Sequence, residues 1–197
     1  MHTCILVSHN KSRLVYDAID SVVAQTYKDW QLVLIDSGLL YDKLKKEYKD
    51  ERITFVKSPE TEETRKEHAM GPWCFNLALK EYVKGSTISY LCDDDVLYTR
   101  AFTIFTKFFR EHPEAIAACA RIDKVVLSEK GNMKQVPTTI PRVLGGKCCN
   151  GIVMDKVYDY LQLTHRTSLL QYMSEWWPID RQTEEHHDGI FLERIGS

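Results

Sequence analysis

Short apolar runs recur through the first half of the chain, and each has the length of one buried strand. Residues 4–7 form a continuously apolar run, which is typical of a strand buried on both faces of a sheet. Residues 31–35, 53–56 and 88–92 repeat this pattern after intervening polar segments. We therefore expect these four runs to be strands of one sheet.

Amphipathic segments separate the apolar runs. Apolar residues recur at helical spacing over residues 14–25, and Ser12 is placed to cap this helix. Residues 41–48 and 73–83 predict two more helices, whereas the charged residues 58–66 predict a surface loop. The alternation of strands and helices predicts an α/β fold in which helices flank a mostly parallel sheet.

The second half of the chain is less regular. Four phenylalanines at helical spacing predict a helix with its aromatic face in the core. They are Phe102, Phe105, Phe108 and Phe109. Residues 116–127 predict a pair of strands, residues 131–132 a turn, residues 148–154 one more strand, and residues 188–195 a helix. No repeat or linker divides the chain, so a single domain is expected.

Composition places the chain among ordinary soluble globular proteins. Its 197 residues are enough for one domain with a substantial core, and 44% hydrophobic with 27% charged residues fits that class. The 26 basic residues are balanced by 28 acidic residues without a basic stripe, so nucleic acid is not an expected partner. No apolar run reaches the roughly 18 residues of a transmembrane segment, and the first residues lack a signal-peptide pattern. Six cysteines without a CxxC pair favour reduced thiols and a cytoplasmic location.

Three consecutive aspartates, Asp93, Asp94 and Asp95, directly follow the apolar run at residues 88–92. In open α/β sheets, ligands bind beyond the carboxyl ends of the strands. Adjacent carboxylates repel one another, so a structure that gathers them favours a bound cation. Carboxylate oxygens suit Mg²⁺ or Mn²⁺, whose coordination is often completed by substrate phosphates. The alternative is a solvated acidic turn in which one aspartate caps the next helix.

Polar groups also follow the other predicted strands. They are Ser8, His9 and Asn10, then Asp36 and Ser37, and much later residues 184–188. In a doubly wound sheet the first two groups would line one crevice with the aspartates, and a nucleotide could lie across it. A carboxylate-bound cation beside a separate carboxylate suits displacement at a sugar or phosphate centre. The cation neutralises a departing diphosphate, and the separate carboxylate takes a proton from the attacking hydroxyl.

Two blocks of sequence form a known pattern. The first contains Val7-Ser8-His9-Asn10, Ala24-Gln25-Thr26-Tyr27 and Leu34-Ile35-Asp36-Ser37. The second contains Asn76-Leu77-Ala78-Leu79, Gly85 and the aspartates of a DxD motif behind their strand. Together they resemble family 2 glycosyltransferases of the GT-A fold, and His187-Asp188-Gly189 is similar to the region that holds the family's catalytic base. Within the family, the resemblance is to a bacterial spore-coat enzyme and, more weakly, to a domain encoded by a chlorella virus.

The resemblance implies a nucleotide-sugar site along the strand ends. The implied donor-binding residues are Val7, Ser8, His9, Asn10, Asp36, Ser37, Arg65 and Asp93. Val7 and His9 would cradle the base, with the imidazole stacking on it. Ser37 stands where the family usually has a second aspartate that reaches the base and ribose, so one charge is lost. Arg65 is the candidate to contact the base or the diphosphate, and Asp93 would approach the ribose.

The resemblance also implies the metal site and the base. Asp94 would hold Mn²⁺ or Mg²⁺, with Asp95 as the alternative ligand. Many family members have aspartate at the position of Cys92, which leaves the register of the motif open by one residue. Asp188 aligns with the general base, and a helix N-cap is its alternative role. Farther along the chain, Trp176 and Trp177 are either a sugar-stacking platform for the acceptor or packing under a C-terminal loop.

The function implied is that of a metal-dependent, inverting glycosyltransferase. It would move a hexose or deoxyhexose from a UDP-sugar to a hydroxyl of a glycan or other acceptor. Residues 1–96 would form the nucleotide-sugar-binding part and residues 97–197 the acceptor-side part, in a domain that is either complete or one piece of a longer protein. Two alternatives stay open: a nucleotidyltransferase, and a non-catalytic nucleotide-sugar-binding module. The location would be cytoplasmic, in the host cell if the protein is viral.

Overall fold

The main sheet contains six strands in the order β3-β2-β1-β4-β8-β5. They are β1 (His2–Ser8), β2 (Trp30–Asp36), β3 (Ile53–Lys57), β4 (Thr87–Cys92), β5 (Ala117–Cys119) and β8 (Leu163–Arg166). The first four are parallel, whereas β8 runs antiparallel to both of its neighbours. A separate two-stranded sheet pairs β6 (Lys124–Leu127) with β7 (Met133–Val136).

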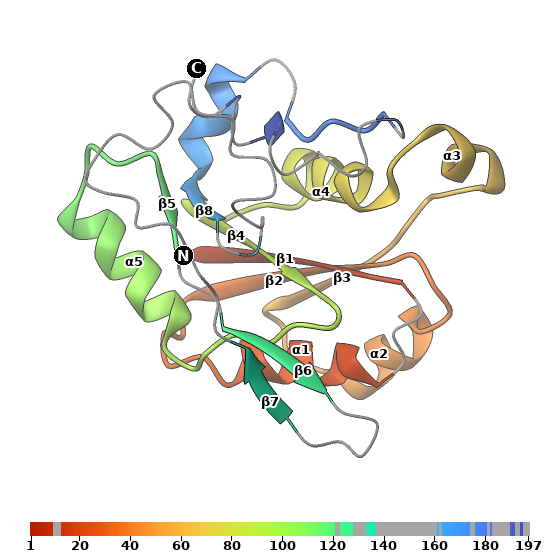
Figure 1. Cartoon of the computed structure of the whole chain (residues 1–197), viewed down its shortest axis with the longest axis horizontal. Helices are drawn as coiled ribbons and strands as arrows, with labels where there is room; N and C mark the ends of the chain where they lie inside the picture. The colour runs from red at the N-terminus through yellow and green to blue at the C-terminus, as the bar shows by residue number, and fades with distance from the viewer. Residues whose placement is uncertain are drawn as a thin grey trace.

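Helices cover both faces of the sheet in this computed structural model. They are α1 (Leu14–Val23), α2 (Tyr41–Glu47), α3 (Glu62–Glu67), α4 (Met70–Glu81), α5 (Ala101–Glu111) and the 3₁₀ helix η2 (Thr167–Tyr172). Figure 1 shows α1 and α2 on one side of the sheet and α4 on the other. The structure describes residues 1–9, 13–120, 123–127, 133–136, 161, 163–173, 176–180, 182, 190–191 and 194. Among these residues, no helix has the length and apolar character needed to cross a membrane.

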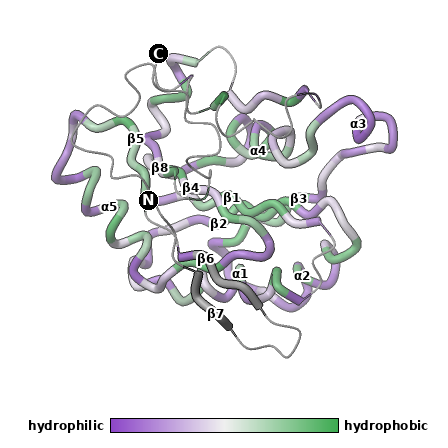
Figure 2. Tube along the Cα trace, in the orientation of Figure 1, coloured by the Kyte–Doolittle hydropathy of each residue, from purple (hydrophilic) through white to green (hydrophobic). Residues whose placement is uncertain are grey.

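The core consists of two apolar clusters separated by the sheet. Strand β1 supplies Ile5 to the cluster beneath α4, and Cys4 and Leu6 to the cluster beneath α1. Successive side chains of a strand point to opposite faces, so a strand covered on both faces must be apolar throughout. Figure 2 shows this hydrophobic centre, with more hydrophilic helices around it. The α/β fold and the four parallel strands are therefore confirmed. Of the four phenylalanines expected in the core, Phe102, Phe105 and Phe109 of α5 are buried, whereas Phe108 is half-buried.

Two sequence-based expectations are wrong in detail. The surface loop expected over residues 58–66 contains the start of α3, because Thr61 and Thr64 form a capping box in which each hydroxyl accepts the other residue's amide. The strand pair expected within residues 116–127 exists as β5 and β6, but β5 pairs with β8 and β6 pairs with β7. Ser12, the turn at residues 131–132 and the strand at residues 148–154 lie outside the described residues. Of the helix expected at residues 188–195, the described Ile190, Phe191 and Arg194 are helical.

Two buried histidines connect strands across the sheet. His2 lies 2.9 Å from the hydroxyl of Thr87 through Nδ1 and 2.9 Å from that of Ser89 through Nε2. Nε2 of His165 lies 2.8 Å from the hydroxyl of Tyr90. Burial disfavours the charged ring, and it lowers the pKa of His2 to about 3 and that of His165 to about 4.

Acidification should therefore destabilise the fold below the ordinary histidine pKa of 6.5. Below pH 6.5 the two histidines are protonated in the unfolded chain but stay neutral in the folded chain. The free energy of unfolding therefore falls as the pH is lowered from 6.5 towards the folded pKa values. The slope is at most about 1.4 kcal/mol per pH unit for each histidine. Urea unfolding between about pH 7.5 and about pH 5 measures this slope, which His165→Gln should reduce. A midpoint independent of pH in the wild type would contradict the prediction.

Candidate functional site

The parallel register brings the carboxyl ends of β1, β2 and β4 to one edge of the sheet. Ser8 of β1 pairs with Asp36 of β2, and Val7 pairs with Cys92 of β4. The residues that follow each strand are therefore neighbours, which is the arrangement expected for a shared crevice.

Hydrogen bonds join the three strand ends. The amide of His9 donates to Oδ2 of Asp93 at 2.9 Å. The amide of Ser37 donates to the carbonyl of Ser8 at 2.9 Å, and Oγ of Ser37 lies 2.8 Å from Nδ1 of His9. His9 is exposed at this edge. The structure thus brings these predicted donor-site residues together, while their contacts with a nucleotide stay a prediction.

Asp36 has a structural task in addition to its predicted one. Its Oδ2 accepts the amides of Leu40 at 3.1 Å and Tyr41 at 2.9 Å, which caps the start of α2. Its Oδ1 and the Oγ of Ser8 are buried without a hydrogen-bond partner among the described residues. Unsatisfied buried polar atoms are uncommon in folded proteins, and such departures concentrate at functional sites.

The three aspartates separate into an inner and an outer set. Asp93 is buried and accepts the amide of His9. Asp94 is exposed and Asp95 is half-buried. One carboxylate oxygen from each of them and Sγ of Cys92 all lie within 4.8 Å of one another. The two carboxylates supply the oxygen ligands that Mn²⁺ or Mg²⁺ prefers, whereas the thiol of Cys92 is a softer donor that suits Zn²⁺ better. The structure therefore groups Cys92 with both predicted metal ligands.

Arg65 reaches the same edge from α3. Its NH2 nitrogen lies 3.0 Å from the carbonyl oxygen of Ser37, 3.4 Å from Nδ1 of His9, and in contact with Glu60 in an ion pair. The sequence predicted Arg65 but not Glu60, whose side chain is only 7% exposed. Glu60 stands in a run of charged residues where nothing in the sequence separates a buried carboxylate from its exposed neighbours.

Other predicted residues lie elsewhere. Asn10 and Asp188 are outside the described residues, so their placement stays a prediction. Trp177 is 2% exposed and stacks on Phe191 with ring centroids 4.0 Å apart, so it belongs to the core and cannot be an acceptor platform. Trp176 is half-buried.

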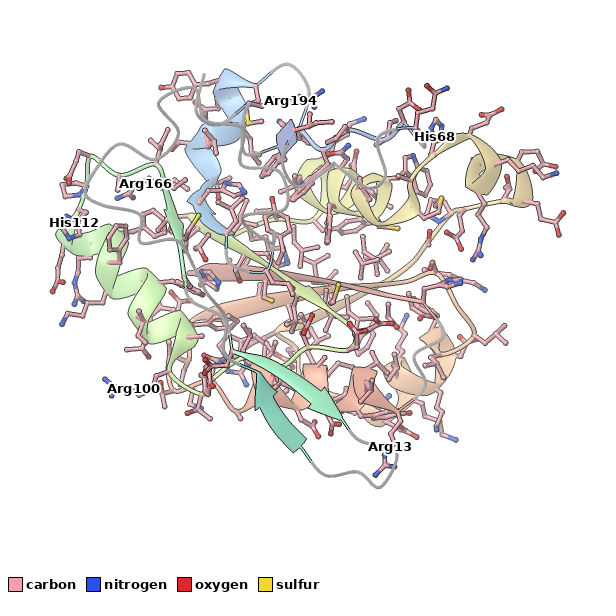
Figure 3. All side chains as sticks on the ribbon, in the orientation of Figure 1. Arg13, His68, Arg100, His112, Arg166 and Arg194 are labelled. Atoms are coloured by element: carbon pink, nitrogen blue, oxygen red, sulfur yellow. The ribbon has the colours of Figure 1, made fainter. Side chains whose placement is uncertain are left out.

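A cavity of about 740 Å³ lies between α4 and the C-terminal segment. Its lining includes Trp73, Lys80, Trp176, Asp180 and Arg194. Figure 3 labels Arg194 beside the C-terminal segment and His68 at the junction of α3 and α4. His68 forms a β-bridge with Asp180, so this segment is attached next to the helix that carries Arg65.

A sequence model described as Glycosyl transferase family 2 matches residues 3–160. The chain belongs to glycosyl transferase family 2. Protein CgeD of Bacillus subtilis (strain 168) is 27% identical over 202 residues, an alignment that covers 98% of this chain and 45% of CgeD. Family membership favours glycosyl transfer over the nucleotidyltransferase alternative.

The fold of this family 2 chain is similar to that of S. aureus TarS. The structure of TarS 1-349 matches with a TM-score of 0.75 at 15% identity, covering 98% of this chain and 54% of that one. TarS 1-349 in complex with UDP-GlcNAc matches with a TM-score of 0.76 at 15% identity, covering 98% and 52%. The chain thus spans about half the length of these relatives. The likeness confirms the GT-A fold, whereas kinship with a spore-coat enzyme or a viral domain, the division at residue 96 and the cytoplasmic location stay predictions.

Replacing Asp36 with alanine should destabilise the fold. The substitution removes the acceptor of two backbone amides at the start of α2, so we expect the free energy of unfolding to fall by about 1–2 kcal/mol. Asp36→Asn keeps an acceptor oxygen and should cost less. Denaturant unfolding measures both, with Asp42→Ala, an exposed residue in the first turn of the same helix, as the matched control. Equal stabilities of Asp36→Ala and Asp42→Ala would contradict this role.

Proposed function

We propose that this chain is a metal-dependent, inverting glycosyltransferase that uses a UDP-sugar. It transfers a hexose or deoxyhexose to a hydroxyl of a glycan or other acceptor. The observation that carries the proposal is the convergence, in a family 2 chain, of three hydrogen-bonded strand ends with the group formed by Cys92, Asp94 and Asp95. This edge offers donors and acceptors for a nucleotide next to ligands for its cation.

The donor side is supported by the polar wall at the ends of β1 and β2. Ser37 orients the ring of His9 through the contact at Nδ1, and Arg65 brings positive charge beside both. An oriented imidazole stacks on a base, and a guanidinium attracts a diphosphate. TarS, which shares this fold, has been crystallised with UDP and with UDP-GlcNAc, which supports a uridine nucleotide as the donor.

The outer carboxylates hold the cation in this proposal. Mn²⁺ or Mg²⁺ would be bound by Asp94 and Asp95 with Cys92 beside them, and when bound it would neutralise the charge of the leaving diphosphate. Asp93 accepts the amide of His9, which joins the ends of β1 and β4. In this proposal Asp93 also approaches the ribose.

Asp188 is the proposed general base. It takes the proton of the acceptor hydroxyl while that oxygen attacks the anomeric carbon from the face opposite the diphosphate. The bond to the sugar forms as the bond to the diphosphate breaks, so the anomeric configuration inverts in one step without a covalent sugar–enzyme intermediate. A hydroxyl is a poor nucleophile at neutral pH, and a positioned carboxylate typically contributes roughly 10²–10⁴-fold to the rate.

Mn²⁺-dependent binding of UDP tests the donor and metal sites. We expect Mn²⁺ to strengthen UDP binding, Asp94→Ala to abolish that gain, and Asp95→Ala to reduce it, because diphosphate and carboxylates complete the shell together. Isothermal titration calorimetry measures the affinities, with Glu81→Ala, an exposed residue at the far end of α4, as the control. Undiminished Mn²⁺–UDP affinity in both variants would contradict the metal site. Equal affinities for UDP, GDP and ADP would contradict uridine selection.

Removal of the base should slow transfer without weakening donor binding. Asp188→Asn keeps the size of the side chain but cannot accept the proton, so kcat should fall by roughly 10²–10⁴-fold while the UDP affinity is retained. Turnover is measured with a panel of UDP-sugars and acceptors, and the anomeric configuration of the product by NMR. Near-normal turnover in the variant, or a product that retains the donor's configuration, would overturn the mechanism.

A further inference from the structure

Glu60 is a buried carboxylate in the loop between β3 and α3. Its side chain is 7% exposed, whereas that of its ion-pair partner Arg65 is 40% exposed. Its Oε1 faces Arg65, and its Oε2 is buried without a hydrogen-bond partner within the described part of the chain. A carboxylate in such surroundings is costly unless a cation compensates it, so Arg65 is needed where it stands.

The NH2 nitrogen of Arg65 connects three segments at the edge of the sheet. Besides Glu60, it contacts the carbonyl oxygen of Ser37 at 3.0 Å, beyond β2, and Nδ1 of His9 at 3.4 Å, beyond β1. Because Oγ of Ser37 also lies 2.8 Å from the same imidazole nitrogen, the wall of the proposed nucleotide site is one connected group. Glu60 is the buried member at one end of this group, and Arg65 is more exposed.

The helix that carries Arg65 is held at its two ends rather than by side chains of its own in the core. Its capping box closes the start, and the bridge of His68 with Asp180 follows its end. α3 has only six residues, none of them buried, and Figure 2 shows it as hydrophilic. Its preceding loop is tied to β2 by the amide of Ser58, which donates to the carbonyl of Asp36 at 3.0 Å. A long arginine side chain on such a helix has many rotamers, and an oppositely charged buried partner selects one of them.

We propose that Glu60 is a positioning residue of the nucleotide site. It acts through Arg65, holding the guanidinium against His9 and Ser37 so that this wall already has the arrangement that receives the base. The inference rests on the proposed function, because it assigns the wall to a nucleotide. Ordering the side chain before binding removes an entropy cost that the ligand would otherwise have to overcome.

The effect of charge and the effect of positioning have opposite signs. A carboxylate close to an anionic nucleotide repels it, so removal of this charge would by itself strengthen UDP binding. Loss of the positioning contact would weaken it by about threefold to tenfold, the range that corresponds to ordering one long side chain. The direction of the change in Glu60→Gln therefore separates the two effects.

The experiment is a double-mutant cycle on UDP binding with Mn²⁺ present. The variants are Glu60→Gln, Arg65→Gln and the double substitution, with Glu62→Gln as the control that removes an exposed charge close by. We expect Glu60→Gln to weaken binding about threefold to tenfold, and Glu62→Gln to leave it unchanged or slightly stronger. Once Arg65 is absent only the charge effect is left, so Glu60→Gln should then leave binding unchanged or slightly stronger. Glu60→Gln should fold, because the half-exposed guanidinium left behind can reach water. If it does not, Glu60→Asp keeps the charge but shortens the side chain, and it should likewise weaken UDP binding; unchanged binding in Glu60→Asp would then overturn the proposal.

Three results would overturn the proposal: unchanged binding in Glu60→Gln, stronger binding, or an equal loss in the presence and absence of Arg65.

A measurement without nucleotide tests the contact between Glu60 and Arg65 independently of the proposed function. NMR of the Arg65 guanidinium should show slow proton exchange in the wild type and fast exchange in Glu60→Gln. If that contrast is seen but the wild-type protein does not bind UDP, the proposed function fails while the contact between Glu60 and Arg65 stands; if UDP binds and no contrast is seen, the positioning role fails.

Discussion

The in-register parallel pairing of β1 with β2 and β4 is the constraint on which the site depends. β1 pairs with β2 from His2 to Ser8 and with β4 from His2 to Val7. A slip of one residue would turn every side chain of β1 to the opposite face. It would move Ile5 and Leu6 out of the clusters that they fill and separate His2 from the hydroxyls of Thr87 and Ser89. The packing on both faces of the sheet therefore fixes where the three strands end, and hydrogen bonds between the polar residues beyond them, such as that from the amide of His9 to Asp93, add to this order.

The carboxylates nearest the sheet accept backbone amides, whereas those farther from it lie close to Cys92. Asp36, at the end of β2, gives one oxygen to the amides that begin α2, and Asp93 gives one to the amide of His9. Backbone amides at strand ends and helix starts need acceptors, so the nearest carboxylates are used for the scaffold. Asp94 and Asp95 lie one and two residues farther out, where Asp94 is exposed and Asp95 is half-buried near the thiol of Cys92. The hydrogen-bonding needs of the backbone amides thus determine which carboxylates serve the scaffold.

Sequence patterns predicted the elements whose side chains are buried and apolar, and missed those whose burial is polar. Strand β8 contains Thr164 and His165, which are fully buried, and His165 is satisfied by Tyr90 rather than by an apolar neighbour. No hydrophobic period marks such a strand, and β5 was assigned the wrong partner because β8 arrives from far along the chain. Glu60 was missed for the same reason, since only the tertiary structure places Arg65 over it. Gly85 was recognised as part of a motif, and the structure supplies its cause: a Cβ there would lie 2.7 Å from the backbone nitrogen of Thr3.

An aromatic cluster on the face covered by α4 packs the strand β4 against residues of the C-terminal segment. Tyr90, two residues before Cys92, packs edge-on against Trp177 at 5.1 Å and against Phe191 at 6.2 Å, and those two rings stack on each other. Phe191, three residues after the proposed base in the sequence, is thereby packed against the strand that ends at the proposed metal ligands. Aromatic clusters of this kind are rigid, because each ring buries a large apolar area and also has a preferred orientation towards its neighbours. A displacement that needs a base on one side of the sugar and a cation on the other requires a fixed separation between them. Through Tyr90, β4 packs directly against Phe191, which is the part of the C-terminal segment that such a requirement would involve.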